Sequence, residues 1–167
     1  MPPSRFSVFH LVKNWPHAMA TWLASLWVGG MAAVGYLAVP ALFHALPDNR
    51  MLAGALAGQL FAAMAYAGMV CAAYLLAYAW WRGGRVAWRQ GTWWLVLCML
   101  ALLLLGQFLL QPQMAALKAQ ALPLDVMHSD FAARFAALHG VASVLYLLQC
   151  LLGLGLLLRV HALRPAT

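Results

Sequence analysis

Four long apolar runs constrain the fold of this chain more than any other feature of its sequence. They extend over residues 18–40, 54–81, 92–110 and 131–158. At a rise of 1.5 Å per residue, each run forms a helix long enough to cross about 30 Å of hydrocarbon. In lipid, every backbone N–H and C=O needs a partner within the protein, and a helix provides its own. The sequence therefore predicts an all-α integral membrane protein, a four-helix transmembrane bundle forming one domain over residues 1–167.

The composition supports this class and excludes a soluble one. Hydrophobic residues make up 66% of the 167 residues, charged residues make up 8%, and the mean hydropathy is +0.83. Such a chain lacks the polar surface to cover a globular core. The apolar runs contain no Lys, Asp or Glu, and their one Arg, Arg134, lies in the first turn of the fourth run, where it can snorkel to the headgroups. The first run is too long for a signal peptide and lacks its cleavage site.

Basic residues are distributed unevenly between the two sides of the predicted bundle. One side carries seven of them, in the N-terminal segment, the second connection and the C-terminal tail: Arg5, Lys13, Arg82, Arg85, Arg89, Arg159 and Arg164. The other side carries three, together with the three acidic residues: Arg50, Lys118, Arg134, Asp48, Asp125 and Asp130. Because Lys and Arg concentrate on the cytoplasmic side, both termini are expected in the cytoplasm.

The same asymmetry predicts the partners of the chain. Most of the net charge of +7 comes from basic residues at the predicted cytoplasmic ends of the helices, where they are expected to face anionic lipid of the bilayer. The stretch WWRGGRVAWRQGTWW, residues 80–94, is typical of an interfacial belt of aromatic and basic side chains. Because these basic segments are short and no recognition fold accompanies them, no nucleic acid is expected as a partner. A homo-oligomer or a membrane-protein partner stays open.

Small residues at intervals of about four predict which helix faces pack closely, because helices in lipid associate by close approach. The first run has such a stripe, and so does the second: Ser25, Gly29, Ala33, Tyr36 and Pro40, then Gly54, Gly58, Ala65, Gly68 and Ala72. Close helix packing is therefore expected at Gly29, Gly30, Pro40, Gly54 and Gly58. The connection after residue 110 has the composition of an interfacial helix that extends the third run, and Ser129 or Asp130 can cap the fourth.

The fourth run contains a histidine in the segment RFAALHGVAS, residues 134–143. His139 shares one helical stripe with small and polar residues: Ser143, Tyr146, Cys150 and Gly153. A polar stripe inside a membrane must face protein rather than lipid, so His139 is expected to be an interior residue. The candidate ligand or polar interior site is formed by His139, Ser143 and Tyr146, with His44 as a further candidate.

The three cysteines, Cys71, Cys98 and Cys150, lie singly in three different runs. They indicate neither a disulfide framework nor a zinc site. Counting the helical rise places all three in the cytoplasmic half of the bilayer, where their thiolates with Met99 could hold a soft ion such as Cu(I). The ordinary alternative is that each acts as a small apolar residue.

Several segments together resemble the bacterial branch of the transmembrane-protein-205-like family, small four-helix membrane proteins of unknown function. The segments are SLWVGGMAAVGYLAVPALFHALP, AGALAGQLF and FAALHGVAS, and the matching positions are Trp27, Gly29, Gly30, Pro40, Leu42, Phe43, Ala53, Gly54, Gly58, Phe61, His139 and Ser143. Relatives often carry an asparagine where this chain has Tyr146. The resemblance implies the four-helix fold and a multi-pass protein of the bacterial inner membrane, but no reaction.

A more distant likeness joins the first run to membrane proteins of the copper-resistance-D and HemJ type. These proteins also combine a W-x-G-G-like first helix with intramembrane histidines, which in the HemJ type are associated with haem. By this resemblance, a haem site in this chain would use His139 with His44, or His139 alone.

Three interpretations of His139 remain open. It can form a structural hydrogen bond across helices, it can serve ligand binding or permeation, or it can take part in redox chemistry. The chain has no Ser-His-Asp set, phosphate loop or H-E-x-x-H motif, so hydrolysis and phosphoryl transfer lack their residues. We therefore predict an accessory or small-molecule-handling membrane protein without catalysis of its own and without a cofactor. The alternative is a haem-b or copper-binding membrane redox protein.

Overall fold

The computed structural model describes the backbone of residues 6–162 and the side chains of residues 15–159. Helix α1 (Phe6–Ala33) continues through a π-helical turn, η1 (Val34–Ala38), into α2 (Val39–Ala45). Helix α3 (Arg50–Gly83) is followed by a 3-10 segment, η2 (Gly84–Arg89). Helix α4 (Gly91–Leu104) continues through a second π-helical turn, η3 (Leu105–Leu110), into α5 (Gln111–Ala121). A short 3-10 segment, η4 (Val126–His128), precedes α6 (Ala132–Ala162).

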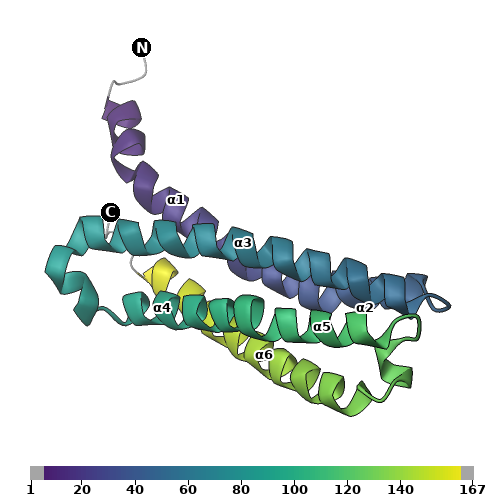
Figure 1. Ribbon diagram of the computed structural model, residues 1–167. Helices are drawn as coiled ribbons and strands as arrows, with labels where there is room; N and C mark the ends of the chain where they lie inside the picture. The colour runs from purple at the N-terminus through teal and green to yellow at the C-terminus, as the bar shows by residue number, and fades with distance from the viewer. Residues whose placement is uncertain (1–5, 163–167) are drawn as a thin grey trace.

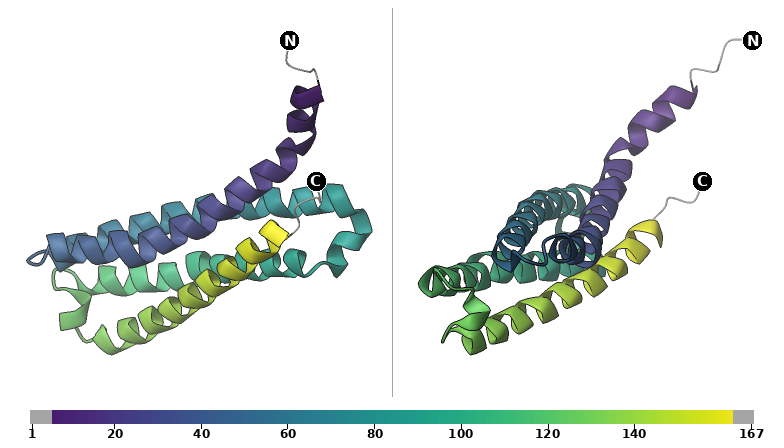
Figure 2. Two further views of the ribbon diagram at one scale, coloured as in Figure 1. Left: turned by 180° about the vertical axis from the view of Figure 1, so that it is seen from behind. Right: turned by 90° about the vertical axis from the view of Figure 1, so that its right-hand side faces the viewer.

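These elements form an up-and-down bundle of four rods (Figure 1). Each rod contacts two neighbours, in the cyclic order α1, α3, α4 and α6. The connection from α2 to α3 and the segment around η4 lie at one end, called here the η4 end, and the connection through η2 lies at the other, the η2 end (Figure 1). The first turns of α1 lean away from the bundle (Figure 2).

The predicted four helices are confirmed, and the structure has four spans long and apolar enough to cross a membrane: Trp15–Ala45, Arg50–Arg89, Gly91–Ala121 and Ala132–Arg159. The part of the chain that the structure describes contains no strand. Helix α5 extends the third span, as the composition of that connection predicted. In the turn before α6 the Ser129 hydroxyl accepts a hydrogen bond from the backbone N–H of Phe131 at 3.2 Å, ahead of the helix that begins at Ala132.

Two prolines account for the two π-helical turns. Pro40 and Pro112 each occupy one of the first positions of the helix that follows such a turn. A proline within a helix has no N–H, and its ring clashes with the carbonyl four residues earlier. Those carbonyls belong to Tyr36 and Phe108, inside η1 and η3. The wider hydrogen-bonding pattern of a π turn relieves this clash without ending the helix. Pro40 itself is exposed, so it shapes the helix and does not form the packing contact expected of it.

The core lies between α1, α3, α4 and α6 and is centred on Trp27, whose side chain is 1% exposed. The indole packs directly on Gly68, where a Cβ atom would lie 2.5 Å from Trp27 Nε1 and 2.7 Å from Leu103 Cδ1. On α6, a Cβ at Gly153 would lie 2.9 Å from Val28 Cγ2. These two glycines therefore permit the close approach of helices.

The structure does not confirm the close packing expected at Gly29 and Gly58. Gly29 is exposed, and at both positions an added Cβ would meet no atom within 4 Å among the residues described. Gly30 packs against the flexible Met64 side chain, and Gly54 faces the Lys118 amine rather than a helix. The buried face of α3 runs through Ala53 and Ala57, one position before each predicted glycine. One position rotates the face by about 100°, so Gly54 and Gly58 lie beside the buried face, whereas Gly68 and Ala72 of the same predicted stripe are buried.

Replacing Gly68 by Ala should therefore destabilise the protein, because the new methyl group would overlap Trp27 and Leu103. Overpacking of this kind costs about 1–3 kcal/mol. The matched control is Gly58→Ala, which adds the same methyl group to the same helix where no atom lies within 4 Å. Thermal unfolding in detergent should give a lower midpoint for Gly68→Ala than for Gly58→Ala, and equal midpoints would contradict the packing described here.

Candidate functional site

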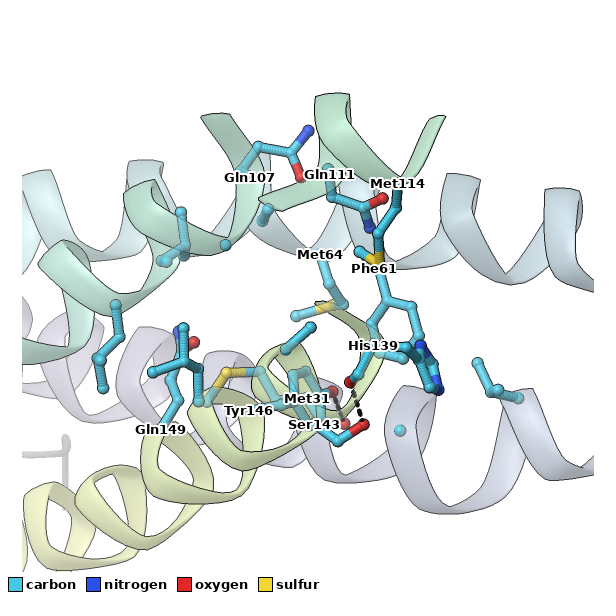
Figure 3. A pocket seen from close by; sticks show the side chains of 18 of the residues that line it. Met31, Phe61, Met64, Gln107, Gln111, Met114, His139, Ser143, Tyr146 and Gln149 are labelled. Carbon is cyan, nitrogen blue, oxygen red and sulfur yellow. Dashed lines mark hydrogen bonds between the residues drawn. The ribbon is translucent and has the colours of Figure 1, made fainter. Parts of the chain in front are cut away.

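A half-open cavity of about 330 Å³ lies between α1 with η1, α3, η3 with α5, and α6 (Figure 3). Much of its wall is apolar, including Met31, Phe61, Met64 and Met114. Its polar lining consists of neutral side chains and one imidazole: Tyr36, Gln107, Gln111, His139, Ser143, Tyr146 and Gln149. None of the lining residues is Asp, Glu, Lys or Arg. The cavity therefore offers hydrogen bonds without a fixed charge.

Both π-helical turns contribute to this wall. Gly35 and Tyr36 belong to η1, and Gly106 and Gln107 belong to η3. A π turn is a local widening that is frequent at functional sites. Beside Gly106 the wall is open, since a Cβ there would meet no atom within 4 Å. The prolines that cause the turns thus also determine where the bundle becomes hollow.

Among the residues whose side chains are described, Gln149 is the buried polar residue, with 6% of its surface exposed. Its side chain rises from α6 into the cavity (Figure 3). Among the residues described, its amide makes no hydrogen bond, but its N and O atoms are not fully enclosed by protein; the fully buried side-chain polar atom without a partner is Trp27 Nε1. Because the N and O atoms of the Gln149 amide border the space of the cavity, a molecule that enters the cavity can reach them, and an amide can both donate to it and accept from it. The amide is therefore free to bind a molecule that enters the cavity.

Tyr146 joins α6 to the first rod. Its hydroxyl donates a hydrogen bond of 2.5 Å to the backbone carbonyl of Met31. Its ring packs on Gly35, where an added Cβ would overlap the ring, and lies edge-on to Phe61 with centroids 5.2 Å apart. Tyr146 therefore fixes one side of the cavity by a hydrogen bond, a glycine contact and an aromatic contact.

His139 lies at the rim of the cavity and is exposed, so the expectation of an interior residue is corrected. Its ring stacks on Phe135 with centroids 6.0 Å apart and an interplanar angle of 9°. Its imidazole makes no hydrogen bond to the residues described; Ser143 instead donates at 2.9 Å to the backbone carbonyl of His139. The reason is that the face of α6 that carries His139 borders the cavity rather than a neighbouring helix. The cross-helix hydrogen bond considered for His139 is made by Tyr146.

The structure does not bring the other candidate ligands into this cavity. His44 is exposed in the last turn of α2 and is not part of the lining. Cys71 is buried, Cys98 is exposed and Cys150 is half-buried. Within the described residues, no three side chains of His, Cys, Asp or Glu are grouped so that they could hold a metal ion. Pairing of His139 with His44 around a haem is thus unsupported by the arrangement of the residues.

Sequence reasoning missed the three glutamines of the cavity, Gln107, Gln111 and Gln149. A signal was available for two of them, because Gln107 and Gln149 lie inside runs that are otherwise almost entirely apolar. Polar groups within a membrane usually face protein or a cavity. The neighbours that line the cavity opposite them could not be known before the helices were arranged.

Fold and cavity together define a multi-pass membrane protein of four helices with a neutral polar site inside the bundle. Residues 22–123 match the family described as "Domain of unknown function (DUF4149)". The match covers more than half of the chain, so the protein belongs to this family. No curated protein and no solved structure matches the chain. The finer resemblances, to the transmembrane-protein-205-like and the HemJ-type proteins, therefore stay predictions.

The hydrogen bonds above give opposite expectations for two residues of α6. Tyr146→Phe removes the hydroxyl that bonds to Met31 but keeps the ring, and should lower the free energy of unfolding by about 1 kcal/mol. His139→Leu should leave it unchanged, because the imidazole has no hydrogen-bond partner to lose. Thermal unfolding of both variants in one detergent compares them. Loss of stability in His139→Leu equal to that in Tyr146→Phe would show that the histidine is a structural partner after all.

Proposed function

We propose that this protein binds a small uncharged molecule inside its helix bundle and acts as an accessory or small-molecule-handling component of the membrane, without catalysis of its own. The ligand class that we infer has an apolar body and at least one group that donates or accepts a hydrogen bond. The observation that carries this proposal is the amide of Gln149, which lines the cavity and makes no hydrogen bond to the described residues.

The size and chemistry of the cavity support this ligand class. Small-molecule sites are about 300–1,000 Å³ in volume and combine apolar walls with a few polar groups, and a cavity of about 330 Å³ lies at the lower end of that range. A charged ligand would lose its hydration without meeting an opposite charge, because the lining has none. A neutral carbonyl or hydroxyl group can bond to an amide, which both donates and accepts.

The lining also supports a role without catalysis. General acid–base catalysis and nucleophilic hydrolysis need a second titratable or activating group beside a histidine. No carboxylate lines the cavity with His139. The Ser143 hydroxyl donates a hydrogen bond to a backbone carbonyl and not to an imidazole nitrogen that could activate it. This arrangement favours binding over reaction.

Copper is the second candidate ligand, and one observation favours it over haem. Three methionines, Met31, Met64 and Met114, line the same cavity as His139. Thioether sulfur and imidazole nitrogen are both donors that Cu(I) accepts. Titration of the purified protein with Cu(I) against a chromophoric chelator tests this alternative: tight binding that Met64→Leu removes would favour copper over the uncharged organic ligand.

Binding of an organic ligand can be tested with a diazirine-bearing fatty alcohol as an uncharged photoprobe. We expect the probe to label peptides from residues 105–114 and 139–149, located by mass spectrometry. Gln149→Leu should lower this labelling about fivefold, the equivalent of one hydrogen bond of roughly 1 kcal/mol. Gly106→Leu, which adds a side chain where the wall is open, should also lower it.

The controls for this experiment are a variant and a probe. Gln113→Leu removes an exposed glutamine of α5 outside the cavity and should label as the wild type does. An alkylammonium probe with the same chain and diazirine should label the cavity less, because the lining offers no negative charge. Equal labelling of wild type, Gln149→Leu and Gly106→Leu would overturn the proposal.

We further propose that the protein lies in the bacterial inner membrane with the η2 end and both termini in the cytoplasm. Support comes from the charges at the two ends of the bundle. Arg82, Arg85, Arg89 and Arg159 lie at the η2 end, whereas the acidic residues lie in the connections at the η4 end: Asp48, Asp125 and Asp130. Basic residues near membrane spans stay on the cytoplasmic side.

Reporter fusions test this orientation. A fusion after Arg85 should give the signal of a cytoplasmic reporter, and one after Asp125 should give that of a periplasmic reporter, because these positions lie at opposite ends of the bundle. Alkaline phosphatase and a fluorescent protein that folds only in the cytoplasm serve as the two reporters. The opposite pattern at both positions would show that the topology is inverted.

A further inference from the structure

The η2 end of the bundle presents arginine side chains on a rigid aromatic base. Three indoles are clustered there: Trp88 stacks on Trp93 with centroids 6.0 Å apart, and Trp80 lies 6.3 Å from each. The Trp94 indole N–H donates to the backbone carbonyl of Trp88 at 2.9 Å. Ala87 of η2 is fully buried. The connection between α3 and α4 is therefore fixed against the bundle.

Three arginines extend from this connection. Arg82 lies in the last turn of α3, and Arg85 and Arg89 belong to η2; all three are exposed. Arg82 donates to the Tyr78 hydroxyl at 3.0 Å, which orients its guanidinium group. Among the residues described, Arg85 and Arg89 have no ion-pair or hydrogen-bond partner.

A fourth arginine reaches the same place from α6. The Arg159 guanidinium lies directly on Gly91, the first residue of α4, where any Cβ would overlap it. Gly91 follows Arg89 by two residues in the sequence, so Arg159 reaches the η2 end, where Arg85 and Arg89 also lie. The four guanidinium groups come from α3, η2 and α6, which are separate segments of the chain.

No carboxylate neutralises these arginines within the part of the chain that the structure describes. The sequence has three acidic residues, Asp48, Asp125 and Asp130. All three lie in the connections at the η4 end, on the far side of the bundle. The arginines therefore need an anion from outside the protein, at a level where tryptophan rings favour the membrane–water interface.

We propose that the η2 end is a binding site for the headgroup phosphate of an anionic phospholipid, held by Arg85, Arg89 and Arg159. Guanidinium groups bind phosphate oxygens in pairs. The exposed indoles of Trp81 and Trp88 lie beside them at the level of the headgroups, and the acyl chains extend along the apolar helices. This site is separate from the cavity, and it holds whether or not the cavity binds a ligand.

The proposal can be tested by lipid retention on the full-length protein. The purified protein is delipidated in detergent and titrated with phosphatidylglycerol or with phosphatidylcholine of the same acyl chains, and bound lipid is counted by native mass spectrometry. We expect tighter retention of phosphatidylglycerol. An arginine near an anionic surface contributes about a factor of five in affinity. The triple variant R85Q/R89Q/R159Q should therefore lose roughly a hundredfold.

Two further variants locate the site. Arg50→Gln removes an exposed arginine at the η4 end and should retain phosphatidylglycerol as the wild type does. Gly91→Ala, which displaces Arg159 without changing the charge, should weaken retention about fivefold. Equal retention of the two lipids, or unchanged retention in the triple variant, would overturn the proposal. Displacement of the lipid by millimolar inorganic phosphate would also overturn it, because the site would then be one for a soluble anion.

Discussion

The structure depends first on the hydrogen bonding of its backbone in hydrocarbon. An unpaired N–H or C=O in lipid costs several kcal/mol, so the spans must be helical wherever they face the bilayer. Pro40 and Pro112 conflict with that requirement, since each removes an N–H and displaces a carbonyl. The π-helical turns η1 and η3 resolve the conflict within continuous helices. Both turns also line the cavity, so the local response to two prolines creates the space that the proposed function needs.

Two polar side chains of α6, Tyr146 and Gln149, differ in whether they form a hydrogen bond to another helix. Tyr146 bonds to the Met31 carbonyl and packs on Gly35, which holds α6 against the first rod. Gln149 lies less than one turn later, and its amide borders the cavity without a hydrogen bond to the residues described. A satisfied polar group stabilises the bundle, whereas an unsatisfied one is a cost that a ligand can remove. Tyr146 therefore holds the wall of the cavity in place, and Gln149 provides a polar group to which a ligand can bind.

Charge is separated along the bundle axis rather than paired. Arginines gather at the η2 end, the three acidic residues lie at the η4 end, and the hydrophobic spans between them carry few charges. At the η4 end, Lys118 donates to the Gly54 carbonyl at 3.4 Å and lies over the Phe135 ring at 5.5 Å, and the Asp125 carboxylate attracts it. The lipid headgroups on the two sides are thus presented with different surfaces, and the neutral cavity lies between them.

The sequence by itself determined the class, the number of helices and the chain segments that form them, because hydrocarbon thickness and backbone hydrogen bonding act on each span separately. It also identified the face of α6 that borders the cavity, through His139, Ser143 and Tyr146. Only the tertiary structure decided what these residues contact. Consecutive residues of a helix are about 100° apart around its axis, and the tertiary structure decided that Ala57, and not Gly58, is buried at the interface of α3. Whether a polar side chain meets a carbonyl, as Tyr146 does, or open space, as Gln149 does, depends on a neighbouring helix that is distant in sequence. Helical periodicity describes one helix at a time, and packing is a property of several.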